Sequence, residues 1–155
     1  MNKQQTFETP YERAGVLTLG LPTLDFGVER HIVPGGGSRA VSIESGDEIS
    51  VLDREGLQIG ELVFFTPDGT SDAGMIGAVS TGGAEVLKSV LEINTRSAMR
   101  TGQSLKSAGF DVGRAEGVKI FADGSKPGDM ETFHAARDGL LIVSSPGGSM
   151  RPEEQ

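Results

Sequence analysis

The sequence contains no cysteine and no tryptophan, and its 155 residues include one tyrosine. Without cysteine, the chain can form neither a disulfide framework nor a thiolate-ligated metal site. It also lacks any apolar run close to the ~20 residues that span a bilayer as a helix. These absences exclude disulfide-stapled domains, thiolate zinc domains and helical membrane proteins.

Positive charge is also scarce. The chain has 14 Lys and Arg against 22 Asp and Glu, so its formal net charge is −8. Nucleic acids and anionic membranes both select for clustered positive charge, so the composition argues against either as a partner. The start of the chain lacks the apolar core of a secretory signal. We therefore expect a cytoplasmic protein.

Glycine, in contrast, is abundant. The 23 glycines are spread along the chain, which favours many tight turns over long helices. We expect an N-terminal arm over residues 1–30, where apolar residues follow no sustained period. A single β-rich domain is expected over residues 31–150. Residues 151–155 are expected to form a polar tail, truncated from a longer chain.

Alternating apolar and polar residues predict β-strands in the first half of this domain. Three such segments, 38–45, 48–54 and 57–66, are bounded by turn-forming Gly-Asp, Glu-Gly and Pro-Asp-Gly sequences. Because the connecting turns are short, we expect the three strands to form an antiparallel meander.

The middle of the chain changes character. Residues 71–84 are small and glycine-rich, which predicts a loop. Apolar residues recur with helical spacing only over residues 85–109. We expect this helix to be interrupted at Thr101-Gly102 and to stop at Gly109, a residue type that often ends helices.

The last part of the domain returns to β-strand patterns. Residues 117–124 predict a short strand, and residues 129–145 predict either one long strand or two joined at Asp138-Gly139, a hairpin-type dipeptide. The expected fold is therefore mainly β: an antiparallel β-sandwich or partly closed barrel with one or two helices packed against it.

Two histidines, His31 and His134, are the first candidates for chemistry. Metal sites usually take three or four ligands from His, Cys and carboxylates at characteristic spacings, and neither histidine has such neighbours. Asp129 precedes His134 by five positions, which places the two on opposite faces of a strand. We interpret His134 as a solvent-facing or interface residue.

Serine and carboxylate chemistry is equally sparse. No Gly-x-Ser-x-Gly sequence marks a serine nucleophile. Asp53, Glu61 and Asp129 could converge in a folded site, although scattered carboxylates usually serve solvation. We assign no catalytic, cofactor-binding or metal residue. The polar candidates that remain are Glu61, Asp129, His134 and Ser145.

Two segments resemble a known family. Residues 33–65, VPGGGSRAVSIESGDEISVLDREGLQIGELVFF, are similar to the opening of the urea carboxylase-associated (urea amidolyase-associated) domain family, which ends in Gln-x-x-Asp-x-x-x-Phe. Gln58, Glu61 and Phe65 take those places. Residues 125–146, SKPGDMETFHAARDGLLIVSSP, are similar to the family's closing segment, which runs from Ser-Lys-Pro-Gly-Asp to a final Ser-x-Cys-Pro.

This resemblance implies a zinc site built on three cysteines, two in a long central segment and one in the Ser-x-Cys-Pro sequence. Here the central segment is contracted to about residues 100–118, and Ser145 stands in the third place. A neutral hydroxyl is a far poorer zinc ligand than a thiolate. The comparison therefore implies a domain that carries no cofactor of its own.

The opening YERAGVLTLGLPTLDFGVERHIVPGGGSRAVSI is also similar to the N-terminal region of trimethylamine-oxide demethylase-type proteins. These resemble fusions of such a region with a cysteine-ligated zinc site and an aminomethyltransferase-type domain. The implied parent enzyme is a lyase that splits trimethylamine N-oxide into dimethylamine and formaldehyde, using zinc and tetrahydrofolate. Our first hypothesis is a non-catalytic N-terminal module that packs against sister domains or forms a homo-oligomer.

Two alternatives remain open. One is a free-standing accessory protein of urea or methylamine catabolism that binds a metabolite or a partner. The other is an enzyme in its own right, with chemistry supplied by a cluster of Glu61, Asp129 and His134.

Overall fold

The computed structural model describes residues 27–146, and the structural statements below concern these residues. The chain divides into two compact units, Met1–Ile32 and Val33–Gln155. Because the described residues begin at 27 and end at 146, most of the predicted arm and the whole of the predicted tail lie outside them. Within the first unit, residues 27–32 contain no helix or strand.

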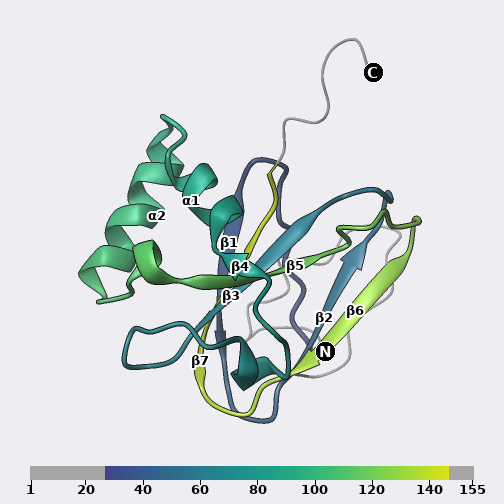
Figure 1. Ribbon diagram of the computed structural model, residues 1–155, viewed down its shortest axis with the longest axis horizontal. Helices are drawn as coiled ribbons and strands as arrows, with labels where there is room; N and C mark the ends of the chain where they lie inside the picture. The colour runs from purple at the N-terminus through teal and green to yellow at the C-terminus, as the bar shows by residue number, and fades with distance from the viewer. Residues whose placement is uncertain (1–26, 147–155) are drawn as a thin grey trace, which may run out of the picture. The chain divides into compact units, whose positions relative to one another are not determined.

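All described elements belong to the second unit (Figure 1). Its strands are β1 (Ser38–Ile43), β2 (Glu48–Asp53), β3 (Gly60–Phe65), β4 (Gly82–Gly83), β5 (Glu116–Ile120), β6 (Asp129–His134) and β7 (Gly139–Ser144). The helices are α1 (Glu85–Leu91) and α2 (Arg96–Ser107), with single 3-10 turns η2 (Ala73–Ile76) and η3 (Val112–Arg114).

The strands form two antiparallel sheets. One has five strands in the order β1-β7-β3-β5-β4, and the other is a two-stranded ribbon of β2 and β6. The prediction of a mainly β domain with one or two helices is confirmed. Of the two expected arrangements, the described residues fit a sandwich, since neither sheet closes into a barrel.

Strand β3 lies at the centre of the core because both of its faces are apolar. Leu62 and Phe64 point to the side where the β2–β6 ribbon and η2 pack. Val63 and Phe65 point to the opposite side, against α1 and α2. The five-stranded sheet is therefore covered by helices on one face and by the ribbon on the other.

The predicted meander is wrong, although all three of its strands exist. β1 pairs with β7, β2 pairs with β6, and β3 pairs with β5 and β7, so no two of the three pair with each other. The short turns between them carry the chain from one sheet to the other. The reason is that each strand has an apolar partner elsewhere, and β2 buries Ile49 and Val51 against the large sheet instead of extending it.

Other connections also differ from the prediction. Residues 129–145 form two strands, but these do not pair as a hairpin, since Asp138-Gly139 leads from the ribbon into the five-stranded sheet. Residues 71–84 contain η2 and β4 in addition to loop. Asp72 begins η2 by accepting a hydrogen bond from the Gly74 N–H at 2.9 Å.

The predicted long helix is two helices. The break falls at residues 92–95 and not at Thr101-Gly102, because Thr95 adopts an extended conformation and caps α2 with its hydroxyl. Gly109, with φ of 88°, follows the end of α2 as predicted. No helix among residues 27–146 has the length and apolarity needed to cross a bilayer.

Candidate functional site

The most elaborate polar arrangement lies at the end of β2. Asp53 is only 3% exposed, and its carboxylate faces the turn that follows the strand. It accepts hydrogen bonds from the backbone N–H groups of Gly56 at 2.8 Å, Gln58 at 3.1 Å and Glu55 at 3.3 Å. An aspartate before Glu-Gly therefore forms a buried turn around its own side chain.

A second segment closes over this turn. The hydroxyl of Ser125 donates to the Asp53 carboxylate and accepts from the Leu57 N–H at 2.9 Å. Gly128 donates its N–H to the Asp53 carbonyl at 2.7 Å. The Ser-Lys-Pro-Gly-Asp sequence thus joins the chain before β6 to the end of β2. We call Asp53, Leu57 and Ser125 the Asp53 cluster.

One residue of this cluster has an unusual backbone conformation. Leu57 has φ of 60°, and among the described non-glycine residues only Phe121, outside the cluster, also has positive φ, at 59°. Each such residue costs about 1–2 kcal/mol, and strain of this kind gathers at functional sites. Leu57 is also 76% exposed. The Asp53 cluster is therefore the best candidate site in the described chain.

The Asp53 carboxylate is held in its charged form. Burial opposes ionisation, but the Ser125 hydroxyl and the three backbone N–H groups outweigh it, so the pKa of Asp53 lies below 3.8. A carboxylate whose lone pairs are all engaged by its own chain is a weak candidate for acid–base or nucleophilic chemistry. Its structural role is to hold together the turn after β2 and the segment before β6.

Glu61, a candidate from the sequence, also has a structural partner. Its carboxylate is fully buried and accepts the backbone N–H groups of Val86 at 3.0 Å and Leu87 at 2.9 Å. These belong to the first turn of α1, whose own N-cap residue, Ala84, offers no side-chain acceptor. Glu61 therefore caps a helix from a neighbouring strand.

Asp129 and His134, two further candidates, lie apart from Glu61. Asp129 is exposed and accepts the Lys126 N–H at 2.9 Å, opposite Asp53 in the β2–β6 register. His134 is at the other end of β6, with its Nε2 3.3 Å from the Glu48 carboxylate. Its side chain is 69% exposed. The structure thus brings Asp129 beside Asp53 but brings neither Glu61 nor His134 there.

Ser145 is positioned by its backbone. It accepts the Gly36 N–H and donates its own N–H to the Gly37 carbonyl, both at 3.0 Å, which ties the end of β7 to the turn before β1. Its neighbour Ser144 is fully buried, and the Ser144 hydroxyl has no hydrogen-bond partner among residues 27–146. Ser144 lies opposite Glu61 in the β3–β7 register.

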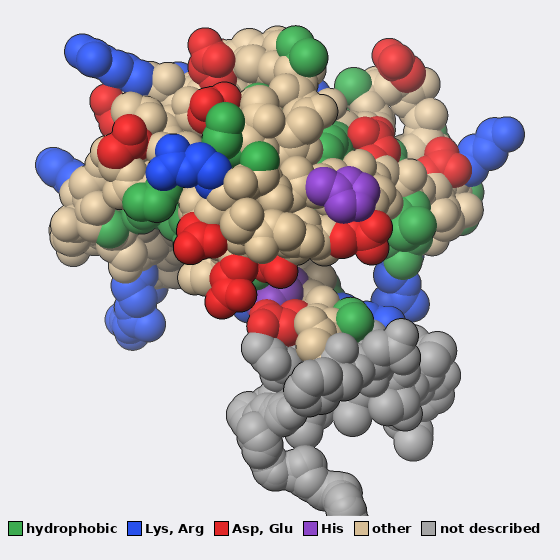
Figure 2. All heavy atoms as spheres, turned by 90° about the horizontal axis from the view of Figure 1, so that it is seen from below, with side chains coloured by type: hydrophobic (Ala, Val, Ile, Leu, Met, Phe, Trp, Pro, Cys, Tyr) green, Lys and Arg blue, Asp and Glu red, His purple; other side chains and the backbone are tan. Residues whose placement is uncertain are grey.

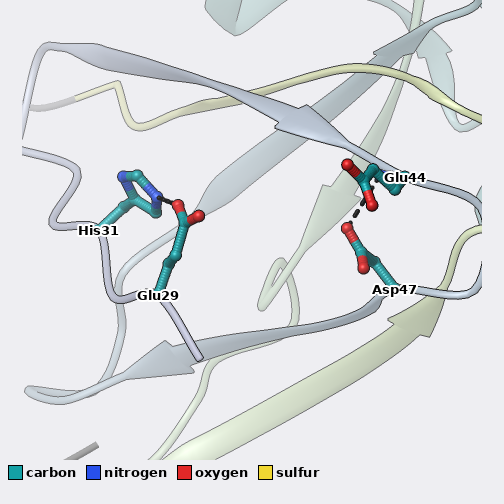
Figure 3. Close-up of polar contacts among 4 residues, drawn as sticks. All are labelled: Glu29, His31, Glu44 and Asp47. Carbon is teal, nitrogen blue, oxygen red and sulfur yellow. Dashed lines mark hydrogen bonds and ion pairs between the residues drawn. The ribbon is translucent and has the colours of Figure 1, made fainter. Parts of the chain in front are cut away.

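Two further polar contacts are local (Figure 3). In the first unit, His31 Nε2 lies 3.0 Å from the Glu29 carboxylate. In the second unit, Glu44 donates its backbone N–H to Asp47 at 2.8 Å, within the turn between β1 and β2. Both contacts are exposed and join residues close in sequence, so neither assembles a site from distant elements.

The donor set does not fit the zinc site that the family resemblance implies. The chain has no cysteine, and among residues 27–146 no three histidine or carboxylate side chains converge as a metal would require. Ser145 offers a neutral hydroxyl where that resemblance places a thiolate, which is a poor donor for zinc.

Sequence reasoning missed the roles of Asp53 and Ser125. Asp53 appeared only as one of several scattered carboxylates, and Ser125 only as part of a turn. A local signal existed: an aspartate followed by Glu-Gly can accept backbone N–H groups across its own turn. No local signal pairs it with Ser125, which is 72 positions away.

Comparison with known proteins gives one relationship. The chain is 32% identical over 141 residues to a trimethylamine-oxide aldolase from Ruegeria pomeroyi. The match covers 91% of this chain but 18% of that protein. The chain is related to part of a trimethylamine-oxide enzyme.

No protein-family model matches the sequence, and no solved structure is significantly similar to it. The resemblance to the urea carboxylase-associated family therefore stays a prediction. The trimethylamine-oxide relationship extends over 91% of the chain.

Proposed function

We propose that this chain is a non-catalytic module of a trimethylamine-oxide-processing enzyme and that it serves packing and assembly. The observation that carries the proposal is the 32% identity to trimethylamine-oxide aldolase across 91% of the chain. Because the chain spans about a fifth of that relative, most of the machinery for any shared reaction would lie in other domains.

The contacts and exposure of the polar side chains support a structural role for this chain. Asp53 and Glu61, the two buried carboxylates, are engaged by backbone N–H groups of the chain itself. Asp129 and His134 are exposed and lie at opposite ends of β6. None of these arrangements presents an unengaged acid or base in a cavity, which is the usual setting for general acid–base catalysis.

The proposed parent reaction is the cleavage of trimethylamine N-oxide to dimethylamine and formaldehyde. Zinc and tetrahydrofolate would be held by domains outside residues 1–155, since the donor set here does not fit a zinc site. This chain's contribution would be a rigid sandwich that fixes the position of those domains.

A chimera tests the proposal. In the Ruegeria pomeroyi aldolase, the matched segment is replaced by this chain, and dimethylamine release from trimethylamine N-oxide is measured with zinc and tetrahydrofolate present. We expect the chimera to keep activity within about tenfold of the parent, and the isolated chain to release none. Dimethylamine release by the isolated chain would contradict a non-catalytic role.

A double substitution within the chimera distinguishes a structural role of this chain from a catalytic one. Asp129→Ala combined with His134→Ala removes the two exposed candidates and should leave kcat unchanged. A large loss of kcat with unchanged thermal stability would instead support the alternative of an enzyme site in this chain.

A further inference from the structure

Helix α2 is the least covered element of the second unit. Of its 12 residues only Ala98 and Leu105 are buried, and Met99 is 61% exposed. Helices in proteins owe most of their stability to packing of an apolar face. Much of the surface of α2 therefore has no partner among the described residues.

The same helix is positively charged, whereas the chain as a whole is acidic. It contains Arg96, Arg100 and Lys106 and no acidic residue, in a chain of net charge −8. The ion pairs found in residues 27–146 involve other side chains. A cationic helix on an acidic protein presents a local surface that attracts carboxylates.

An apolar groove runs beside α2, between the helix and strands β1 and β7. It has a volume of about 410 Å³, and Arg100 is among its lining residues. Its apolar lining is formed by Ala40, Leu105, Ala108, Phe110 and Leu140. We call this groove, with Arg96, Met99 and Arg100, the α2 face.

A complementary surface lies on the β2–β6 ribbon, on the side turned away from the core. Leu52 and Met130 sit opposite each other there and are 52% and 59% exposed. The cross-strand pairs along this ribbon face are Glu48–His134, Ser50–Thr132 and Leu52–Met130. The ribbon face thus has the exposed Glu48 carboxylate, 3.3 Å from His134 Nε2, at one end and exposed apolar side chains at the other.

The wider surface has the same charge character. In Figure 2, Asp and Glu side chains are spread over the face shown, and most Lys and Arg side chains project from its margins. An acidic face of this kind can attract a cationic patch of a second copy.

We propose that the α2 face docks onto the ribbon face of a second copy of this chain. Glu48 would meet Arg96 and Arg100, while Leu52 and Met130 would enter the groove beside α2. Pairing of two α2 faces is disfavoured because it would bring arginines against arginines. The contact is heterologous, so it generates rings or open chains of copies.

This inference names the partner for the assembly role proposed above, but its test needs no turnover. Sedimentation velocity of the chain is measured from micromolar to near-millimolar concentration. We expect reversible association at about 0.15 M salt that weakens at about 1 M, where the screening length falls from about 8 Å to about 3 Å. A chain that stays monomeric throughout would overturn the proposal, whatever the chimera shows.

Substitutions on each surface locate the contact. Arg96→Glu with Arg100→Glu, or Leu52→Thr with Met130→Thr, should weaken association by about tenfold or more. All four positions are exposed, so the fold should tolerate the changes, which circular dichroism verifies. Association unaffected by either pair would show that another surface is used and would contradict the proposal.

Matched controls exclude a general charge effect. Lys88→Glu on α1 with Lys119→Glu on β5 makes the same change in net charge outside the residues of either surface and should leave association unaltered. Mixing the Arg96→Glu, Arg100→Glu protein with a Glu48→Lys protein restores opposite charges across one contact. We expect that mixture to associate more tightly than either variant alone, and failure to do so would count against Glu48 as the partner.

Discussion

Leu87 donates its backbone N–H to the carboxylate of Glu61 at 2.9 Å, although the two residues are 26 positions apart. The contact joins α1 to the central strand of the large sheet. Since Ala84 cannot cap α1 with its side chain, a strand residue supplies the acceptor. Several expected outcomes depend on buried polar contacts of this kind.

Replacing Glu61 by alanine should destabilise the fold strongly. The N–H groups of Val86 and Leu87 would lose their acceptor in a buried place, and each unsatisfied group costs about 1–3 kcal/mol. We expect a loss of about 3 kcal/mol in urea unfolding. Thr95→Ala, which removes the exposed cap of α2, is the control and should cost about 1 kcal/mol. Equal losses in the two variants would contradict the capping role of Glu61.

The two buried serines should respond to alanine with opposite signs. Ser125 donates to a buried carboxylate, so Ser125→Ala should lower the free energy of unfolding by about 2 kcal/mol. Ser144 has no partner for its hydroxyl in the described part of the chain, so Ser144→Ala should leave stability unchanged or raise it by about 1 kcal/mol. Thermal and urea unfolding measure both. A clear loss in Ser144→Ala would show that its hydroxyl is engaged in solution.

Asp53 should contribute to acid unfolding. Its pKa is lowered below 3.8 in the folded state by Ser125 and the turn N–H groups, against the effect of burial. As pH falls, the unfolded state therefore binds the proton first, so the stabilisation is present above about pH 4 and is lost as pH falls through the folded-state pKa. Asp53→Asn should flatten the stability profile in this range. A profile as steep as that of the wild type would show that Asp53 is not responsible.

Asp68 offers a second, exposed test of the same principle. The Thr66 hydroxyl, followed by the Thr70 N–H and hydroxyl, lowers the pKa of Asp68 from 3.8 to about 2. Thr66→Val removes the largest of these contributions and should raise the pKa of Asp68 toward 3.8. Carboxyl NMR titration measures the shift directly, and an unmoved titration would rule out the Thr66 contact.

Two glycines should differ sharply when replaced by alanine. A Cβ on Gly139 would overlap the Phe64 ring and the Phe65 carbonyl, so Gly139→Ala should cost about 3 kcal/mol. Gly102 lies within α2 with open space around it, so Gly102→Ala should stabilise the protein by about 1 kcal/mol. Melting temperatures of the two variants should move in opposite directions, and a stable Gly139→Ala protein would contradict the packing of β7 on β3.

The positions of strands and helices could be predicted from sequence because they depend on neighbouring residues. Period-two alternation marked β1, β2 and β6, and the exposed His134 agrees with the solvent-facing position expected for it. Helical spacing and the glycine at position 109 located the helical region and its end. The break at Thr95 was missed because a capping threonine resembles any other polar residue in a helix.

Strand partners and polar contacts were decided only by the tertiary structure. β1 pairs with β7, about a hundred residues away in sequence, and β3 pairs with β5 and β7. These pairings form because burying apolar faces between two layers stabilises the fold more than pairing neighbouring strands through short turns. Composition and alternation determined that this is a β-rich domain without thiolate chemistry. The roles of Asp53, which holds two loops together, and Glu61, which caps a helix, depend on hydrogen-bond donors that are distant in sequence. Only folding brings these donors within hydrogen-bonding distance.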